Sequence, residues 1–184
     1  AKKLKTGSCP STRCLTPEFC TVLKIDHQPQ ISLLKKISRI PGIKKVFIAS
    51  GIRYDLVLND SAHGKQYLQR LISQHISGQM KVAPEHSEDR MLRLMGKPSA
   101  LDLKRFTHLF GQITRAVGKE QYLTYYLIAA HPGCTDQDMR NLKQYTSREL
   151  GISPEQVQIF TPTPSTYSSV MYYTGLDPFT LQPI

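Results

Sequence analysis

The chain has 184 residues, of which 40% are hydrophobic and 21% are charged, and its formal net charge at pH 7 is +10. This length and composition are typical of one folded domain and exclude the disordered and fibrous classes. No apolar run approaches the ~18 residues of a membrane span, and no hydrophobic segment follows the basic N-terminus as a signal peptide would require. We therefore expect a cytoplasmic protein with no membrane partner.

Residues 1–28 are predicted to form a loop segment that carries three of the four cysteines. Cys9, Cys14 and Cys20, the cysteine triplet, have the spacing C-x4-C-x5-C. This spacing fits poorly with zinc ribbons, whose cysteines pair two to four residues apart. Three thiolates with Asp26 or His27 could still bind zinc or an iron-sulfur cluster, and the alternative is buried or idle thiols. The triplet is kept as a candidate auxiliary metal site.

Residues 29–166 alternate between helix-like and strand-like patterns. Four strands are predicted, at Lys45–Ala49, Gln79–Ala83, Tyr122–Ala130 and Gln156–Phe160. Their starts are 34, 43 and 34 residues apart, as suits right-handed βαβ units. Their apolar runs are continuous rather than alternating, as in parallel sheets covered on both faces. Four strands are too few to close an eight-stranded barrel, so the pattern predicts an α/β fold with an open parallel sheet or part of a barrel.

Five helices are predicted from helical periodicity and capping signals. Ser87 is expected to be the N-cap of the third, and Thr135 with Asp138 predicts a capping box at the start of the fifth. The other three carry the apolar stripes Leu33, Leu34, Ile37 and Ile40; Leu68, Leu71, Ile72 and His75; and Phe106, Leu109, Phe110, Ile113 and Val117. Residues 167–184 are predicted to form a C-terminal tail.

Polar clusters follow each predicted strand, whereas the segments that enter the strands carry only turn and helix-stop signals. In parallel α/β folds the ligand binds beyond the carboxyl ends of the strands, so these clusters should converge on one face. The leading residues of the four clusters are Arg53, Glu85, His131 and Thr161. We expect them at one end of the sheet.

Several long motifs in this order resemble the YgiQ-type family of radical S-adenosylmethionine (SAM) proteins. The resemblance covers nearly the whole chain, and its motifs are Ala49–Asp55, Lys81–Met95, Tyr126–Met139, Thr161–Thr166 and Met171–Pro178. It implies a partial (β/α)6 barrel of which this chain supplies the later four units. In that family a C-x3-C-x2-C motif holds a [4Fe-4S] cluster, which donates an electron to SAM and yields a 5′-deoxyadenosyl radical.

This chain has no C-x3-C-x2-C spacing, and the cysteine triplet cannot stand in for it. The resemblance therefore implies that the cluster motif lies upstream, in the same longer polypeptide. The 184 residues alone are expected to bind no cofactor and to be inactive. The substrate is not predicted.

The resemblance also implies a set of cofactor-binding residues. Glu85 and His86 occupy the strand end where relatives hydrogen-bond the ribose or the methionine end of SAM, and Arg53 could clamp the methionine carboxylate. The full set is Ser50, Arg53, Glu85, His86, His131, Gly133 and Thr161. Each has a structural alternative: Glu85 or Ser87 could cap a helix, Arg53 could pair with Asp55, and His131 could be a hydrogen-bonded core histidine.

Two other functions are compatible with the sequence. The net charge of +10 suggests a module that binds nucleic acid, but its lysine clusters lack the aromatic interleaving of a single-strand binding groove. The cysteine triplet suggests a structural metal-binding domain that would unfold on chelation. The partial barrel that the resemblance implies lacks its early units, which would leave Lys45–Ala49 as a sheet edge, so we expect marginal stability or self-association.

Overall fold

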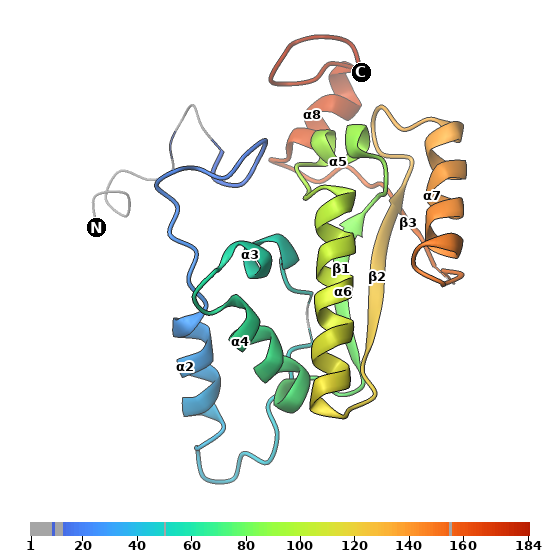
Figure 1. The fold of residues 1–184 in the computed structure, drawn as a ribbon. Coiled ribbons are helices and arrows are strands. Elements are labelled where there is room, and N and C mark those ends of the chain that lie inside the picture. Colours follow the sequence, from blue (N-terminus) through green and yellow to red (C-terminus); the bar gives the residue numbers. More distant parts are fainter. Residues whose placement is uncertain (1–8, 10–12, 50, 155) are drawn as a thin grey trace.

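The computed structural model describes residues 9, 13–49, 51–154 and 156–184, which form helices around a small sheet (Figure 1). The first half contains α2 (Gln28–Ile37), α3 (Tyr54–Asn59), α4 (Gly64–Arg70) and the π-helical turn η1 (Leu71–His75). Then follow β1 (Gln79–Glu85), α5 (Asp89–Met95), α6 (Ala100–Val117), β2 (Tyr122–Ala129), α7 (Asp136–Arg148), β3 (Gln158–Ile159) and α8 (Tyr167–Thr174).

The sheet is parallel and has the order β1-β2-β3. Gln79 of β1 lies opposite Tyr122 of β2, and Ile128 of β2 lies opposite Gln158 of β3. The prediction of an α/β fold with a parallel sheet is therefore confirmed. Its last strand is shorter than predicted, with only two residues in β3 and one further bond from the Phe160 amide to the Ala129 carbonyl.

The predicted strand at Lys45–Ala49 is wrong, because this stretch forms no regular strand. Its backbone bonds to the end of η1 instead: the Ile48 amide donates to the His75 carbonyl, and the His75 ring lies 2.8 Å from the Val46 carbonyl oxygen. Among the described residues of this segment and the next few, Ile52 forms a single parallel bridge to Val82 of β1. The segment is therefore an apolar connector whose partner is a helix end.

Helices α6 and α7 pack against one face of the sheet. Met80 and Val82 of β1 point into the hydrophobic core, where they meet Phe106 of α6. Leu127 of β2 lines a cavity of about 310 Å³ together with Leu142 of α7. Lys81, Tyr122 and Tyr126 point to the other face and are exposed. One side of the sheet is thus left open over β1 and β2.

The apolar stripes are confirmed where a helix has neighbours on that core. Leu68, Leu71, Ile72 and His75 are all buried, and α6 buries three of its five predicted residues. The first stripe is partly wrong, because Leu33 and Ile40 are 56% and 52% exposed while Ile31 and Leu34 are buried. Helix α2 contacts α4, and its buried residues Ile31 and Leu34 are three apart and therefore lie on the same face of the helix.

The two capping predictions have opposite outcomes. Thr135 and Asp138 form the capping box: the Thr135 hydroxyl accepts from the Asp138 amide, and the Asp138 carboxylate accepts from the Thr135 amide at 2.7 Å. Ser87 is not an N-cap, because α5 begins after Glu88 and the Ser87 hydroxyl has no hydrogen-bond partner among the described residues. One further residue with an extended backbone, Glu88, precedes the first helical residue, Asp89.

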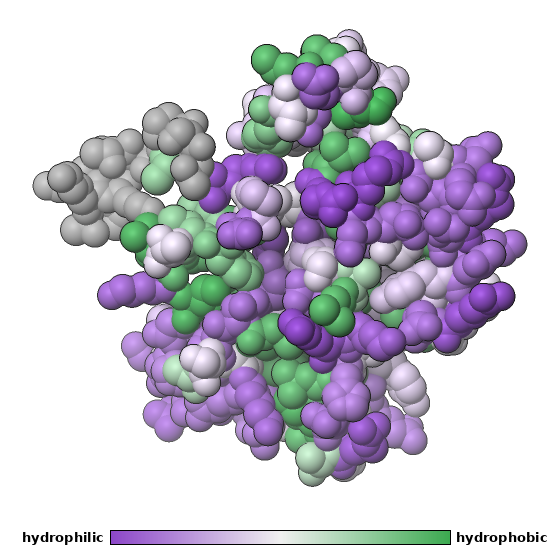
Figure 2. Space-filling view, turned by 45° about the horizontal axis from the view of Figure 1, so that its top comes forward, coloured by the Kyte–Doolittle hydropathy of each residue, from purple (hydrophilic) through white to green (hydrophobic). Residues whose placement is uncertain are grey.

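The surface is mostly hydrophilic, with separate hydrophobic patches (Figure 2). One of these patches lies at the top of the view, where α8 and the C-terminal tail expose Val170, Phe179 and Leu181. None of the described helices is both long enough and apolar enough to cross a membrane.

Candidate functional site

The carboxyl ends of the three parallel strands define one end of the sheet. β1 ends at Glu85, β2 ends two residues before His131, and β3 ends two residues before Thr161. Helices α5 and α8 lie beyond this end (Figure 1). Arg53 directly follows the Ile52 bridge to β1. The topology therefore places the leading residues of the four predicted clusters along the same end, while Ser50 lies outside the described residues.

Glu85 is the most unusual side chain at this end. It is 8% exposed, and its Oε1 forms a salt bridge of 2.7 Å with Nζ of Lys97. Its Oε2 is buried and has no hydrogen-bond partner in the described part of the chain. The side chain makes no capping bond to α5. A buried carboxylate oxygen without a donor is costly and therefore calls for an explanation.

The backbone is strained at the same place. Glu85 and Ala130 have φ angles of 69° and 57°, in the left-handed region that residues with a side chain rarely adopt. The first is the last residue of β1 and the second directly follows β2. Each such conformation costs of order 1–3 kcal/mol, and strained residues of this kind cluster at ligand-binding sites. Their occurrence at two neighbouring strand ends therefore indicates a functional site.

His86 and Cys134 bring the first two strand ends into contact. His86 is 1% exposed, its Nδ1 accepts a hydrogen bond from the Glu88 amide, and its Nε2 lies 3.8 Å from Sγ of Cys134. Because Nδ1 accepts, Nε2 carries the proton and points at the sulfur. Burial lowers the pKa of His86, and burial together with the nearby Asp138 raises the pKa of Cys134. The pair is therefore a neutral imidazole beside a neutral thiol at pH 7.

Arg90 fastens α5 to the turn before α7. Its Nη2 donates to the Gly133 carbonyl oxygen at 2.9 Å and to the Asp138 carboxylate at 2.6 Å. Burial alone would raise the pKa of Asp138. Hydrogen bonds from Thr135 and the charge of Arg90 have a larger opposite effect, so the pKa lies below its usual value. Gly133 has φ of 80°, and a Cβ there would come within 3.0 Å of the Leu94 side chain. The turn thus needs glycine for both conformation and space.

Arg53 and His131 make the contacts that a purely structural role predicts for them, and Thr161 makes little contact at all. Arg53 donates through Nε to both carboxylate oxygens of Asp55 at 3.0 Å. His131 is 3% exposed, donates to the Pro132 carbonyl oxygen and accepts from the Ser168 hydroxyl at 2.8 Å, so both ring nitrogens are satisfied within the protein. Thr161 is exposed and its hydroxyl reaches only the Ile159 carbonyl, at 3.4 Å.

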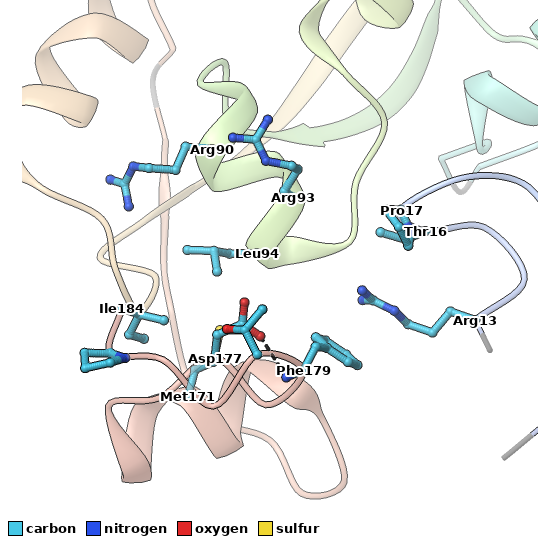
Figure 3. Close-up of a pocket in the computed structure, with 12 residues that line it drawn as sticks. Arg13, Thr16, Pro17, Arg90, Arg93, Leu94, Met171, Asp177, Phe179 and Ile184 are labelled. Carbon is cyan, nitrogen blue, oxygen red and sulfur yellow. Dashed lines mark hydrogen bonds between the residues drawn. The ribbon is translucent and has the colours of Figure 1, made fainter. Parts of the chain in front are cut away.

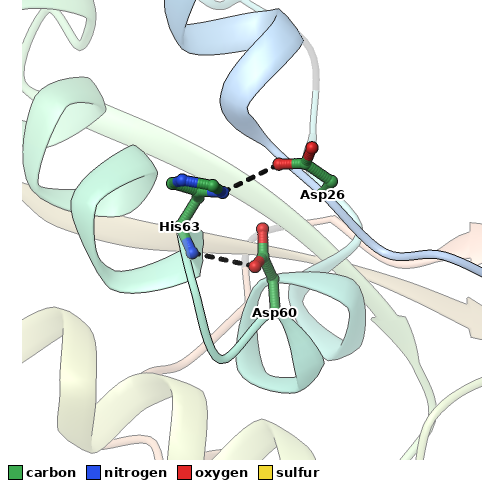
Figure 4. Close-up of side chains that lie close together, drawn as sticks. All are labelled: Asp26, Asp60 and His63. Carbon is green, nitrogen blue, oxygen red and sulfur yellow. Dashed lines mark hydrogen bonds and ion pairs between the residues drawn. The ribbon is translucent and has the colours of Figure 1, made fainter.

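The cysteine triplet does not assemble in the described part of the chain. Cys9 and Cys14 are exposed, and the Cys20 amide donates to the Cys14 carbonyl oxygen. Instead, the metal-ligating atoms that do lie within 4.8 Å of one another belong to Asp26, Asp60 and His63 (Figure 4). An auxiliary metal site at the triplet stays a prediction.

The group around Asp60 is explained by hydrogen bonding alone. Its Oδ2 accepts from the amide and the ring Nδ1 of His27, both at 2.7 Å, and its Oδ1 accepts from the amides of Ala62 and His63. The His27 ring stacks on Tyr67 at a centroid distance of 4.7 Å. Burial raises the pKa of Asp60, but these hydrogen bonds lower it more, to about 2. The carboxylate therefore joins the N-terminal loop to the α3–α4 turn.

Sequence reasoning missed Lys97, Arg90 and Asp60. Lys97 follows Gly96, whose left-handed conformation ends α5 and turns the chain back toward the strand end. The sequence indicates that Gly96 ends a helix after Met95, but it does not indicate that Lys97 pairs with Glu85. Asp60 lies in the polar run Asn59-Asp60-Ser61 before a helix, which is a recognisable capping signal.

Comparison with known proteins relates the chain to one group of relatives. It is 60% identical over 181 residues to a UPF0313 protein of Fusobacterium nucleatum subsp. nucleatum. The matched region covers 98% of this chain and 32% of the relative. It is 46% identical to a UPF0313 protein of Methanocella arvoryzae and 43% identical to one of Clostridium perfringens, over 100% of this chain and 30% and 27% of those relatives. No family model and no solved structure matches the chain.

The chain therefore spans about a third of the length of the curated relatives that it matches. UPF0313 is the designation of the YgiQ-type family, so the resemblance drawn from the sequence motifs is confirmed.

Proposed function

We propose that this chain, homologous to a segment of the UPF0313 proteins, supplies part of the SAM-binding face of a radical SAM enzyme core. The [4Fe-4S] cluster motif would lie elsewhere in the same longer polypeptide, since no C-x3-C-x2-C occurs in these 184 residues. The observation that carries the proposal is the buried Oε2 of Glu85, which lacks a donor within the described residues at the carboxyl end of β1.

The residues at this end fit the donors that SAM offers. Its ammonium group and ribose hydroxyls need acceptors, and a carboxylate is a strong acceptor for both. Oε1 of Glu85 is fixed by Lys97, which leaves Oε2 as the free acceptor. The Ser87 hydroxyl is a second buried polar group without a partner in the part of the chain that the structure describes. When bound, SAM and the cluster would supply radical chemistry, which these residues alone do not provide.

The open face of the sheet supports the partial barrel that the family resemblance implies. In a (β/α) barrel the helices cover the outer face of the strands, and the inner face looks into the barrel. Here α6 and α7 cover one face, and Lys81 and Tyr126 of the other face line a hollow of about 430 Å³ with Gly51. The remaining part of a longer polypeptide would complete this wall and cover the exposed residues.

Each residue has a separate role in this proposal. Glu85 accepts hydrogen bonds from the cofactor, and Lys97 positions its carboxylate. His86, neutral because burial lowers its pKa, holds the two strand ends together through Cys134. Arg90 and His131 are positioning residues, since their polar atoms already bind Asp138 and Ser168.

The test is SAM binding by the full-length protein that contains this segment, reconstituted with its cluster and measured by titration calorimetry. Glu85→Gln keeps the shape of the side chain and removes its charge, and we expect the SAM dissociation constant to rise roughly 10- to 150-fold, as for a lost charged hydrogen bond of about 1.5 to 3 kcal/mol. The matched control is Glu88→Gln, three residues away and outside the strand end, which should leave affinity unchanged.

The salt bridge between Glu85 and Lys97 also determines how Glu85→Gln should affect stability. Because the carboxylate pairs with a partly buried Lys97, the variant should lose some thermal stability, unlike a residue that contacts only the cofactor. Lys97→Met separates the two effects, since it breaks the pair but leaves the acceptor in place. Unchanged SAM affinity in a folded Glu85→Gln protein would refute the proposal.

A further inference from the structure

A second pocket lies apart from the open sheet face, between three segments that are distant in the sequence (Figure 3). It has a volume of about 470 Å³ and is bounded by the N-terminal loop at Arg13 to Pro17, by α5, and by the C-terminal tail after α8. Thr16 ties the loop to α5, because its hydroxyl donates to the Gly96 carbonyl oxygen at 3.2 Å. The pocket is thus built entirely within this chain.

The lining of the pocket is positively charged. Three arginines, Arg13, Arg90 and Arg93, line it against one acidic residue, Asp177. Arg90 is paired with Asp138, and Oδ1 of Asp177 accepts from the Phe179 amide at 2.8 Å. No carboxylate among the described residues lies within ion-pair distance of Arg13 or Arg93. Arg13 and Arg93 are therefore the two lining arginines without an ion-pair partner in the described part of the chain.

Arg13 is held in an orientation suited to binding an anion. Its Cζ atom lies 3.8 Å from the centroid of the Phe179 ring and 5.7 Å from that of Tyr167. Figure 3 shows the side chain reaching from the loop toward Phe179 and Asp177. A cation–π contact uses the face of a planar guanidinium, whereas its N–H donors lie in the plane, so an arginine held in this way can bind a carboxylate or phosphate in a forked geometry.

Apart from Thr16 and Thr180, the rest of the lining is apolar. Leu94 of α5, Met171 of α8 and Ile184 of the tail contribute hydrocarbon surface, and Met171 is only 1% exposed. Apolar walls with a few oriented polar groups are typical of sites that bind small organic molecules. A ligand that fits this lining combines an anionic group with an apolar body.

We propose that this pocket is a binding site for a small organic anion, in which Arg13 holds a phosphate or carboxylate group and the apolar walls hold an aromatic or aliphatic body. The site uses neither Glu85 nor the open sheet face. It goes beyond the proposed SAM site, and its test contains no SAM, so either proposal can fail without the other.

The experiment measures probe binding to the 184-residue chain by titration calorimetry. Phenyl phosphate and benzoate are the anionic probes, and the tighter of the two identifies the anionic group. Phenol, which lacks the anion, and inorganic phosphate, which lacks the ring, should each bind at least tenfold more weakly than the tighter anionic probe. Failure of both anionic probes to bind, or equal binding of phenol, would overturn the proposal.

Substitutions assign the binding to this pocket. Arg13→Gln should weaken the tighter probe at least tenfold, and Phe179→Leu, which keeps every charge but removes the stacked ring, should weaken it at least threefold. The matched control is Arg105→Gln, an arginine of α6 whose side chain is 64% exposed and lies outside the pocket, which should change affinity less than twofold. Circular dichroism confirms that each variant is folded. Wild-type affinity in both pocket variants would show that the probes bind elsewhere.

Discussion

Asp60 is the residue on which the packing of the N-terminal half should depend most strongly. Its side chain is 1% exposed and accepts from four donors, two of them on His27. In Asp60→Asn the retained oxygen can still serve Ala62 and His63, but the new NH₂ group faces the two donors of His27. The variant therefore removes the negative charge that both His27 donors face, loses the bond from the His27 amide and leaves that buried N–H without its acceptor.

The expected loss of unfolding free energy is about 3 kcal/mol, because each bond to a charged group contributes roughly 1.5 to 3 kcal/mol and neighbouring bonds are not additive. The pKa of Asp60 gives an independent value. It falls from 3.8 to about 2 on folding, which corresponds to about 2 kcal/mol. A carboxyl whose pKa is lowered by folding stabilises the protein above its unfolded pKa, so this contribution is present at pH 7 and is lost as the pH falls from about 4 to 2.

Urea unfolding followed by circular dichroism tests both values, at pH 7 and at steps down to pH 2.5. Asp26→Asn is the matched control, since Asp26 belongs to the same group of side chains but its own side chain is 50% exposed, and it should cost less than about 1 kcal/mol. Asp60→Asn should also lose less stability than the wild type between pH 5 and pH 2.5. The account is refuted if both variants cost the same at pH 7, or if the acid dependence of Asp60→Asn matches that of the wild type.

Three further outcomes are expected. Gly64→Ala should cost more than about 2 kcal/mol by denaturant unfolding, because a Cβ there would overlap a backbone carbonyl oxygen, whereas Gly111→Ala inside α6 has room and should be neutral or stabilising; equal effects would contradict this. Thr135→Ala should cost about 1 kcal/mol through loss of the capping box, and no change in melting temperature would argue against it. Replacing all of the cysteine triplet by serine in the reconstituted full-length protein should leave SAM cleavage detectable by chromatography of 5′-deoxyadenosine, and complete loss would show that the triplet is needed for SAM cleavage.

Features that depend on neighbours along the chain could be predicted from the sequence. The capping box of Thr135 and Asp138 joins residues three apart, and the stripe of α6 repeats over an 18-residue helix. The parallel sheet was also predictable, since the βα spacing leaves few alternatives. The position of Glu85 at a strand end followed from the same spacing.

Features that depend on distant partners could not be predicted. Lys45–Ala49 has a strand-like composition, but its Val46 and Ile48 backbone groups bond to His75, which no local pattern reveals. The pairing of Glu85 with Lys97 depends on how the chain turns after α5. The pocket around Arg13 needs the loop at residues 13–17 to meet the segment after α8, and the sequence of either segment alone indicates only a loop or a tail.

The most direct test of the central claim is hydrogen–deuterium exchange on the reconstituted full-length protein with and without SAM. The account predicts that SAM slows exchange in peptides that contain residues 83–88 and 130–135, the ends of β1 and β2, while α2 and α4 on the far side of the core are unaffected. Saturating SAM that leaves both strand ends unprotected, or protection confined to α2 and α4, would contradict the claim that this chain forms the SAM-binding face.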